Sequence, residues 1–308
     1  MFANRCTRSA TFSLCLFIFI AQLVHADDTP LDTYHSTSSE VRVTFFPTDV
    51  NNRAIDTVTK DDFVIVDGDL VIRDFRSLAR ADETVLDMVI LVDASESVAR
   101  RLPAAMDEVL RLISQTAVDS NLSVISFGGL QPALLCTGDC RTWEARQSLL
   151  SVNGSGTTPL FDAIAYGAQI LSGRNAPGAR PVMILFSDGD DTISKASSKE
   201  ALQSVIDTGA LLYTVDLTQV DSNGARSNPS GSAALLRMAE ATGGRYFSMA
   251  EGGAGVLPAA IEDLRNSYVV TYELPNSVVG FHSLRILPKH NPNLRFHCRN
   301  GYVYGEIQ

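Results

Sequence analysis

The sequence predicts an α/β fold in which a doubly wound, mainly parallel β-sheet is flanked by a β-rich module from the N- and C-terminal segments. The central part of the chain alternates apolar strand-like runs with amphipathic helical stretches, which is typical of a parallel sheet covered by helices on both faces. Both flanks instead carry short β-rich runs separated by turn residues. The composition, 45% hydrophobic and 19% charged, is that of a folded protein.

The first 26 residues are interpreted as a secretory signal peptide. Arg5 and Arg8 precede an apolar run over 12–24, and Ala26 stands just before an acidic start at Asp27. An uncleaved anchor is disfavoured because the run is shorter than the roughly 20 residues that a bilayer span needs. We therefore expect a secreted or periplasmic protein with no transmembrane segment after cleavage.

Cleavage of the signal changes the charge and the cysteine count. Loss of two arginines takes the formal net charge from −10 to −12, which is poorly suited to a phosphate backbone, so no nucleic acid partner is expected. Three cysteines remain, Cys136, Cys140 and Cys298. Because the expected compartment is oxidising, we hypothesise a disulfide between Cys136 and Cys140, which leaves Cys298 unpaired.

The α/β region is expected over residues 84–266. Its strands and helices alternate along the chain, so the ligand site should lie beyond the carboxyl ends of the strands. The predicted strands are 85–92, 122–127, 181–187, 210–217 and 245–249, and the predicted helices are 98–117, 159–172, 196–208, 231–242 and 256–267.

The two flanks, residues 27–83 and 267–308, are each too short for an independent core. One interpretation is that they pack together as a single β-rich module. The other is that each extends a sheet separately. The short strands are expected at 41–46, 63–66, 70–72, 267–274, 281–287, 294–298 and 302–304.

Polar side chains gather where three predicted strands or turns end. Asp93 follows the first strand and is spaced with Ser95 and Ser97 in "DASES", so alternate residues of one turn point to one side. Thr158 stands just before a helix in "GSGTTPL", and Asp188 follows a strand in "SDGDD". Carboxylate and hydroxyl oxygens are hard ligands, which suit Mg²⁺, Mn²⁺ or Ca²⁺ better than zinc. Any one of these residues alone would more often be a helix cap than a ligand, so the interpretation rests on the whole set.

This set resembles the von Willebrand factor A (VWFA) domain with its metal-ion-dependent adhesion site. In that site an Asp-x-Ser-x-Ser motif, a distant Thr and a distant Asp share one divalent cation. The resemblance covers residues 84–266 and implies a Rossmann-like VWFA domain. "DASES" matches the first motif in full, Thr158 fits the ligand threonine better than Thr157, and Asp188 matches the family's "TDG" with Ser187 in place of Thr. The implied metal ligands are Asp93, Ser95, Ser97, Thr158 and Asp188.

Neighbouring acids receive other roles. We expect Glu96 to face solvent, and Asp190 and Asp191 to belong to a polar loop or a rim that attracts cations. "VTKDDF" at 58–63 and the ending "NGYVYG" are similar to a secreted bacterial subgroup of VWFA proteins typified in acidobacteria. This second resemblance concerns architecture more than activity.

The resemblance implies a divalent-metal-dependent protein-binding module for adhesion or complex assembly. Ser95, Ser97 and Thr158 would bind the ion directly, while Asp93 and Asp188 would act partly through water. An Asp or Glu carboxylate of a protein partner would then complete the coordination. The alternative is a structural module in which the ion only stabilises the loops.

Catalysis is not expected. The chain has no Gly-x-Ser-x-Gly elbow and no His-Glu-x-x-His helix, and "GSGTT" lacks the lysine of a P-loop. His282, His290 and His297 with Cys298 are too irregularly spaced for a zinc site and are interpreted as scattered sheet or surface residues.

Overall fold

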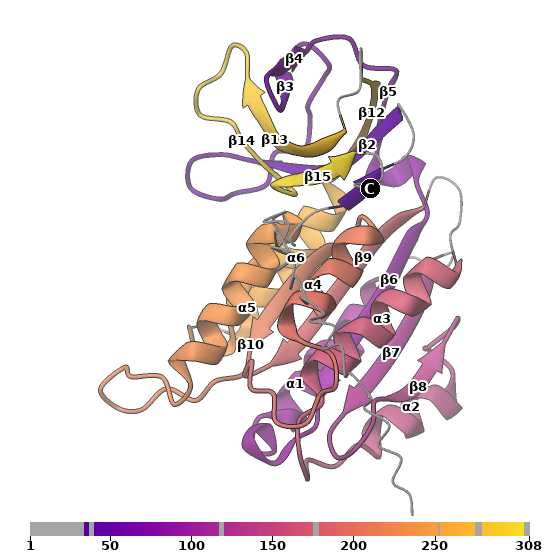
Figure 1. Ribbon diagram of the computed structural model, residues 1–308. Coiled ribbons are helices and arrows are strands. Elements are labelled where there is room, and N and C mark those ends of the chain that lie inside the picture. The colour runs from indigo at the N-terminus through magenta and orange to yellow at the C-terminus, as the bar shows by residue number, and fades with distance from the viewer. Residues whose placement is uncertain are drawn as a thin grey trace, which may run out of the picture.

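The computed structural model of the protein describes residues 34–36, 40–116, 120–174, 179–251, 253–274 and 279–304. The expected signal peptide, residues 1–26, lies outside these ranges. Among the helices of the described ranges, none combines the length and the apolar character that a bilayer crossing demands. An α/β layered unit carries a module of β-strands at one end (Figure 1).

The central sheet has six strands in the order β11-β10-β9-β6-β7-β8. Every neighbouring pair is parallel except β7 and β8, which are antiparallel. This order confirms the doubly wound, mainly parallel fold. The strands are β6 (Leu86–Asp93), β7 (Asn121–Phe127), β8 (Ala133–Thr137), β9 (Arg180–Ser187), β10 (Leu211–Asp216) and β11 (Tyr246–Ser248).

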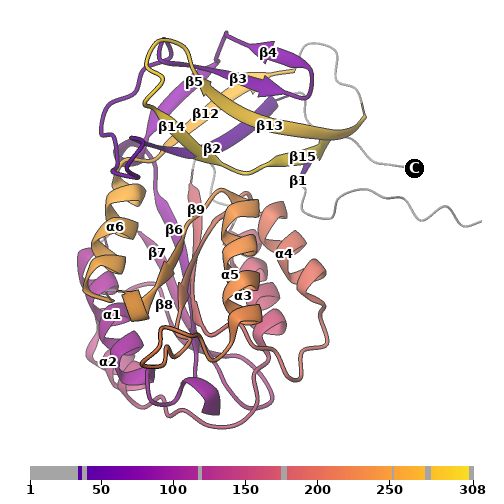
Figure 2. The ribbon, with the colours of Figure 1, turned by 90° about the vertical axis from the view of Figure 1, so that its left-hand side faces the viewer.

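Helices cover both faces of this sheet (Figure 2). In β6, Met88, Ile90 and Val92 pack against α1, α2 and α6, while Val89 and Leu91 pack against α3, α4 and α5. Burial on both faces explains why the strand is apolar at every position rather than at alternate ones. The helices are α1 (Leu102–Gln115), α2 (Trp143–Leu150), α3 (Leu160–Arg174), α4 (Ser198–Asp207), α5 (Pro229–Thr242) and α6 (Gly253–Arg265).

Two local features differ from the sequence-based expectation. The helix predicted over 98–117 begins at Leu102, with Pro103 in its first turn, and a short 3-10 helix, η2 (Glu96–Val98), precedes it. Strand β8 and helix α2 were not predicted. β8 is an edge strand with partly exposed side chains, and α2 has only two buried residues, so neither carries a clear hydrophobic period.

The structure contains the hypothesised disulfide. Cys136 in β8 is bonded to Cys140 in the turn that follows, with their Cα atoms 5.7 Å apart. Cys298 has no disulfide partner.

The two flanks form one β module made of two packed sheets. One sheet has the order β1-β15-β13-β3-β4 and the other β14-β2-β12-β5. N-terminal β2 lies between C-terminal β12 and β14, and β3 pairs with β13, so the flanks do not extend separate sheets. The strands are β1 (Tyr34–Ser36), β2 (Glu40–Thr48), β3 (Phe63–Asp67), β4 (Leu70–Ile72), β5 (Ser77–Arg80), β12 (Tyr268–Glu273), β13 (Gly280–Pro288), β14 (Arg295–Cys298) and β15 (Gly301–Tyr304).

The β module is packed directly against the α/β unit. Val43 and Phe45 of β2 point into the core of the β module, whereas Phe46 belongs to the core that α1 and α6 cover. The Phe46 ring lies 6.2 Å from the ring of Tyr213 in β10. One strand therefore contributes to both cores, and the two parts form one packed body.

Candidate metal centre

Asp93 and Asp188 lie at the ends of neighbouring parallel strands. Val92 of β6 is paired with Phe186 of β9, so the residues that follow emerge side by side at the carboxyl edge. The Asp93 side chain is fully buried, and Asp188 is 7% exposed. The Ser187 hydroxyl donates to Asp93 Oδ2 at 2.7 Å, and the Ser95 amide donates to Asp93 Oδ1 at 2.9 Å.

The electrostatics of this pair are those of an uncompensated negative site. Burial raises the pKa of Asp93 to about 6; hydrogen bonds from Ser187 and Ser95 oppose this shift, and the negative charge of Asp188 adds to it. Within the described residues, no Arg, Lys or His forms an ion pair with either carboxylate. A buried carboxylate needs a partner of opposite charge, so a cation fits this position.

The "DASES" turn brings two hydroxyls to Asp93. The Oγ atoms of Ser95 and Ser97 lie 3.1 Å apart, with Ser95 buried and Ser97 exposed. The Ala94 amide donates to the Phe127 carbonyl at the end of β7, at 2.7 Å. A Cβ atom on Gly128 would lie 2.3 Å from the Ala94 carbonyl oxygen, so the turn packs against backbone that only glycine permits.

Thr158 comes from a third loop that is tied to the other two. The amides of Ser155 and Glu96 bind the carbonyls of Ala94 and Gly156, which joins this loop to the "DASES" turn. The Thr158 amide donates to the Thr192 hydroxyl at 2.8 Å, which joins it to the loop after β9.

The two threonines of this loop differ. Thr158 is 3% exposed, whereas the exposed Thr157 hydroxyl donates to the Gly129 carbonyl. The structure thus gathers the loops of all five predicted ligands at one edge, and the Thr157 hydroxyl is engaged elsewhere.

The neighbouring acids lie around this cluster. Glu96 and Asp190 are exposed. Asp191 Oδ1 accepts from the Phe161 amide at 3.3 Å in the first turn of α3 and from the Ser194 hydroxyl at 2.5 Å, so it fixes a loop and caps a helix.

Two carboxylates and three hydroxyls are the donor set of a hard divalent cation. In the part of the chain that the structure describes, no group of three or more His, Cys, Asp or Glu residues is placed to hold a metal ion. The strand-end cluster differs from such a group because three of its five residues carry hydroxyls, and only two are acids. His282 and His297 instead contact Asp67 and Thr48 inside the β module.

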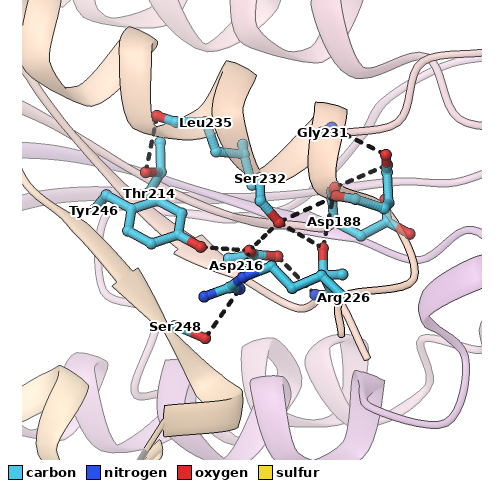
Figure 3. A network of polar contacts seen from close by, with 11 residues as sticks. Asp188, Thr214, Asp216, Arg226, Gly231, Ser232, Leu235, Tyr246 and Ser248 are labelled. Atoms are coloured by element: carbon cyan, nitrogen blue, oxygen red, sulfur yellow. Dashed lines mark hydrogen bonds and ion pairs between the residues drawn. The ribbon is translucent and has the colours of Figure 1, made fainter. Parts of the chain in front are cut away.

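A further buried carboxylate, Asp216, lies beside this cluster and escaped the sequence analysis (Figure 3). Asp216, at the end of β10, accepts from Ser232 Oγ at 2.6 Å, Tyr246 Oη at 2.5 Å and Arg226 Nη1 at 2.8 Å through Oδ2. Its Oδ1 accepts from the Thr218 amide at 2.7 Å. These donors satisfy both oxygens, so Asp216 acts as an anchor for neighbouring elements rather than as a metal ligand.

The Asp216 network also supports the Asp188 turn. The Asp188 carbonyl accepts from Asn228 Nδ2 at 3.2 Å, and a Cβ atom on Gly231 would lie 2.2 Å from its oxygen. The start of α5 is therefore packed against the backbone of Asp188. A signal was present in the sequence, because Asp216 is the second-last residue of the predicted strand 210–217, near the same edge.

Comparison with known proteins gives a family match over the α/β unit. A family model described as von Willebrand factor type A domain matches residues 87–256. No curated protein sequence matches the chain. Similar solved structures include an aerotolerance-related membrane protein from Bacteroides fragilis, at 16% identity and TM-score 0.45, covering 58% of this chain and 98% of that one.

Two further solved structures match a larger share of this chain. The von Willebrand factor type A protein from Catenulispora acidiphila has 13% identity and TM-score 0.47, and the match covers 80% of this chain and 74% of that one. The pilus adhesin SpaC from Lactobacillus rhamnosus GG has 13% identity and TM-score 0.49, and the match covers 66% of this chain and 32% of that one.

Proposed function

This chain belongs to the von Willebrand factor type A family, and from that premise we propose that it is a divalent-metal-dependent protein-binding module. It would serve adhesion or the assembly of a complex. The proposed ligands of one Mg²⁺, or of Mn²⁺ or Ca²⁺, are Asp93, Ser95, Ser97, Thr158 and Asp188.

The observation that carries the proposal is the buried carboxylate pair, which has no positive partner among the described residues. Asp93 is fully enclosed, and its two hydrogen bonds leave the charge of the pair uncompensated. A divalent ion neutralises both carboxylates at once. Ser95, Ser97 and Thr158 would bind it directly, and Asp93 and Asp188 partly through water, which leaves one position for an outside ligand.

A protein carboxylate is the proposed outside ligand. Ser97 is exposed, which gives the ion an open side, and the edge lies at the end of the molecule farthest from the β module (Figure 1). Leu130 is 83% exposed and stands next to Gly129, whose amide binds the Thr157 carbonyl at the rim. A partner with an Asp or Glu beside an apolar residue matches this surface.

Binding is favoured over catalysis by the residues around the ion. Both histidines with side-chain contacts, His282 and His297, lie in the β module and are engaged by Asp67 and Thr48. Among the described residues, no histidine contacts the hydroxyls of the candidate centre, so the usual pairing of a hydroxyl nucleophile with a histidine base is not found there.

The second candidate function is a structural module whose ion only stabilises the loops. It is favoured by burial, because Asp93, Ser95 and Thr158 are each no more than 3% exposed. Both functions predict that the metal raises the melting temperature, but only the first predicts metal-dependent partner exchange.

A secreted or periplasmic location is part of the proposal. It rests on the predicted signal peptide and on the disulfide between Cys136 and Cys140, because such bonds persist in oxidising compartments. The similarity to the acidobacterial subgroup is consistent with it.

The test is a pull-down from a bacterial envelope extract with the mature protein immobilised, in Mg²⁺ or in chelator. We expect partners that elute with chelator and that Ser95→Ala fails to retain. Asp190→Asn, which alters an exposed neighbouring acid, is the matched control and should behave as wild type. Capture that is unaffected by chelator and by Ser95→Ala would refute the proposal, and metal-dependent melting without capture would favour the structural module.

A further inference from the structure

A cavity of about 470 Å³ lies at the opposite edge of the central sheet from the candidate metal centre. It is lined by residues of the last turns of α1 and α6 and of the link between β5 and β6. The end of α6 lies next to the β module (Figure 2). Its volume is in the range of sites for small organic molecules. β9 begins here with Arg180 and ends at Ser187, so this site and the carboxyl edge are separated by the length of a strand.

Arg180 is the buried cation of this cavity. Arg180 is only 4% exposed. Its Nη1 donates hydrogen bonds to the Leu264 carbonyl and the Ser267 hydroxyl. Its Nε has no hydrogen-bond partner, and no described carboxylate forms an ion pair with it. Burial lowers its pKa to about 10, which still leaves the guanidinium charged at neutral pH.

The charges around the cavity do not balance within the described residues. Arg80 and Arg265 line it as well, and Asp82, which pairs with Arg80 at 3.4 Å, is the one acid in the lining. The C-terminal ends of α1 and α6 add about half a negative charge each. About one positive charge is left, which a single monoanion would neutralise.

The remaining lining is partly apolar. Side chains from the strand and both helices contribute, namely Leu86, Leu112, Ile261 and Leu264. A ligand for this cavity therefore combines one negative group with an apolar body.

We propose that this cavity binds an aliphatic monocarboxylate, with its carboxylate at Arg180 and Arg265 and its chain against the leucines and Ile261. A guanidinium binds a carboxylate through paired hydrogen bonds, and the Nη2 of Arg180, which lines the cavity, donates to no described residue. The site is independent of the metal centre, since no residue of either lines the other.

Octanoate is the probe for the test, titrated into the mature protein by calorimetry. We expect octanoate to bind at least about tenfold more tightly than 1-octanol, which lacks the charge, and than acetate, which lacks the chain. Chelator should leave the affinity unchanged. Equal binding of octanoate and 1-octanol would overturn the carboxylate assignment, and equal binding of octanoate and acetate would overturn the apolar one.

Substitutions of residues that line the cavity test whether octanoate binds there. Arg180→Met should weaken octanoate binding at least about tenfold, because it removes a charge-assisted contact. Arg265→Ala, at an exposed residue of the lining, should weaken it several-fold and serves if Arg180→Met does not fold. Arg237→Ala, on the exposed face of α5, is the matched control. Octanoate affinity unchanged in Arg265→Ala and in folded Arg180→Met would refute the proposal.

A carboxylate of the chain itself is the competing occupant. Asp119 lies outside the described residues but next to Ser120, which lines the cavity. Asp119→Asn should bind octanoate with wild-type affinity. Tighter binding by this variant would mean that the chain supplies its own anion, which would overturn the proposal.

Discussion

Protonation of His297 is expected to loosen the packing of the β module on the central sheet. His297, in β14, stacks on Phe46 with ring centroids 4.6 Å apart and an interplanar angle of 8°. Its Nε2 lies 3.0 Å from Oγ1 of the fully buried Thr48. Burial lowers the pKa of His297 from 6.5 to about 4, and the positive charge of Arg245 lowers it further.

The direction of the change in stability depends on whether the folded or the unfolded protein becomes protonated at the higher pH. Between pH 6.5 and 4 the unfolded chain is protonated at His297 while the folded protein is not. The folded protein therefore loses stability as the pH falls, and the contribution of neutral His297 is complete only above pH 6.5. With these pKa values, linkage predicts losses of about 1.4 kcal/mol at pH 5.5 and about 2.6 kcal/mol at pH 4.5.

The assay is urea unfolding of wild type and His297→Gln at pH 8, 5.5 and 4.5. Gln is neutral at each pH, so it removes the titration while keeping a group that can bind Thr48. Asp263, whose pKa burial raises to about 7, opposes the effect but is present in both proteins and cancels in their difference. The wild-type advantage over His297→Gln should shrink by the amounts above; an advantage that is the same at all three pH values would refute the reasoning.

Three further substitutions have defined outcomes. Asp216→Asn removes the buried carboxylate that pairs with Arg226 at 2.8 Å and should destabilise the protein by about 3 kcal/mol in urea unfolding. Gly231→Ala places a Cβ 2.2 Å from the Asp188 carbonyl and should weaken Mn²⁺ binding about tenfold by calorimetry. Phe46→Ala empties a fully buried site at the junction and should cost about 4 kcal/mol, lowering the urea midpoint. If one of these variants behaved like wild type, the contact from which its effect is predicted would not have the role given to it here.

The fold was accessible from the sequence because its strands are long apolar runs. Residues 85–92 predicted a strand buried on both faces, and β6 is buried from Asp87 to Asp93. Strand β8 and helix α2 were missed, since an edge strand and a surface helix need little burial. The pairing of the flanks was left open in the sequence because β2 and β12 find each other across more than two hundred residues.

The candidate site was predicted only as far as strand ends could be identified. Asp93 and Asp188 follow apolar runs, so their common edge is implied by parallel pairing, and their role as ligands stays a prediction. The hydrogen bond from Ser187 to Asp93 was not foreseen, because it depends on the register of β6 and β9. The Asp216 network was missed for a similar reason, since its donors come from three separate elements.

Binding of Mn²⁺ to the mature protein, followed by electron paramagnetic resonance of the free ion, tests the metal centre most directly. Asp188→Ala removes one predicted ligand, and Asp190→Asn alters an exposed acid two residues away. The account predicts one Mn²⁺ per chain in wild type and Asp190→Asn, displaced by excess Mg²⁺, and a loss of that ion in Asp188→Ala. Absence of bound Mn²⁺ in wild type, or equal binding by the two variants, would contradict it.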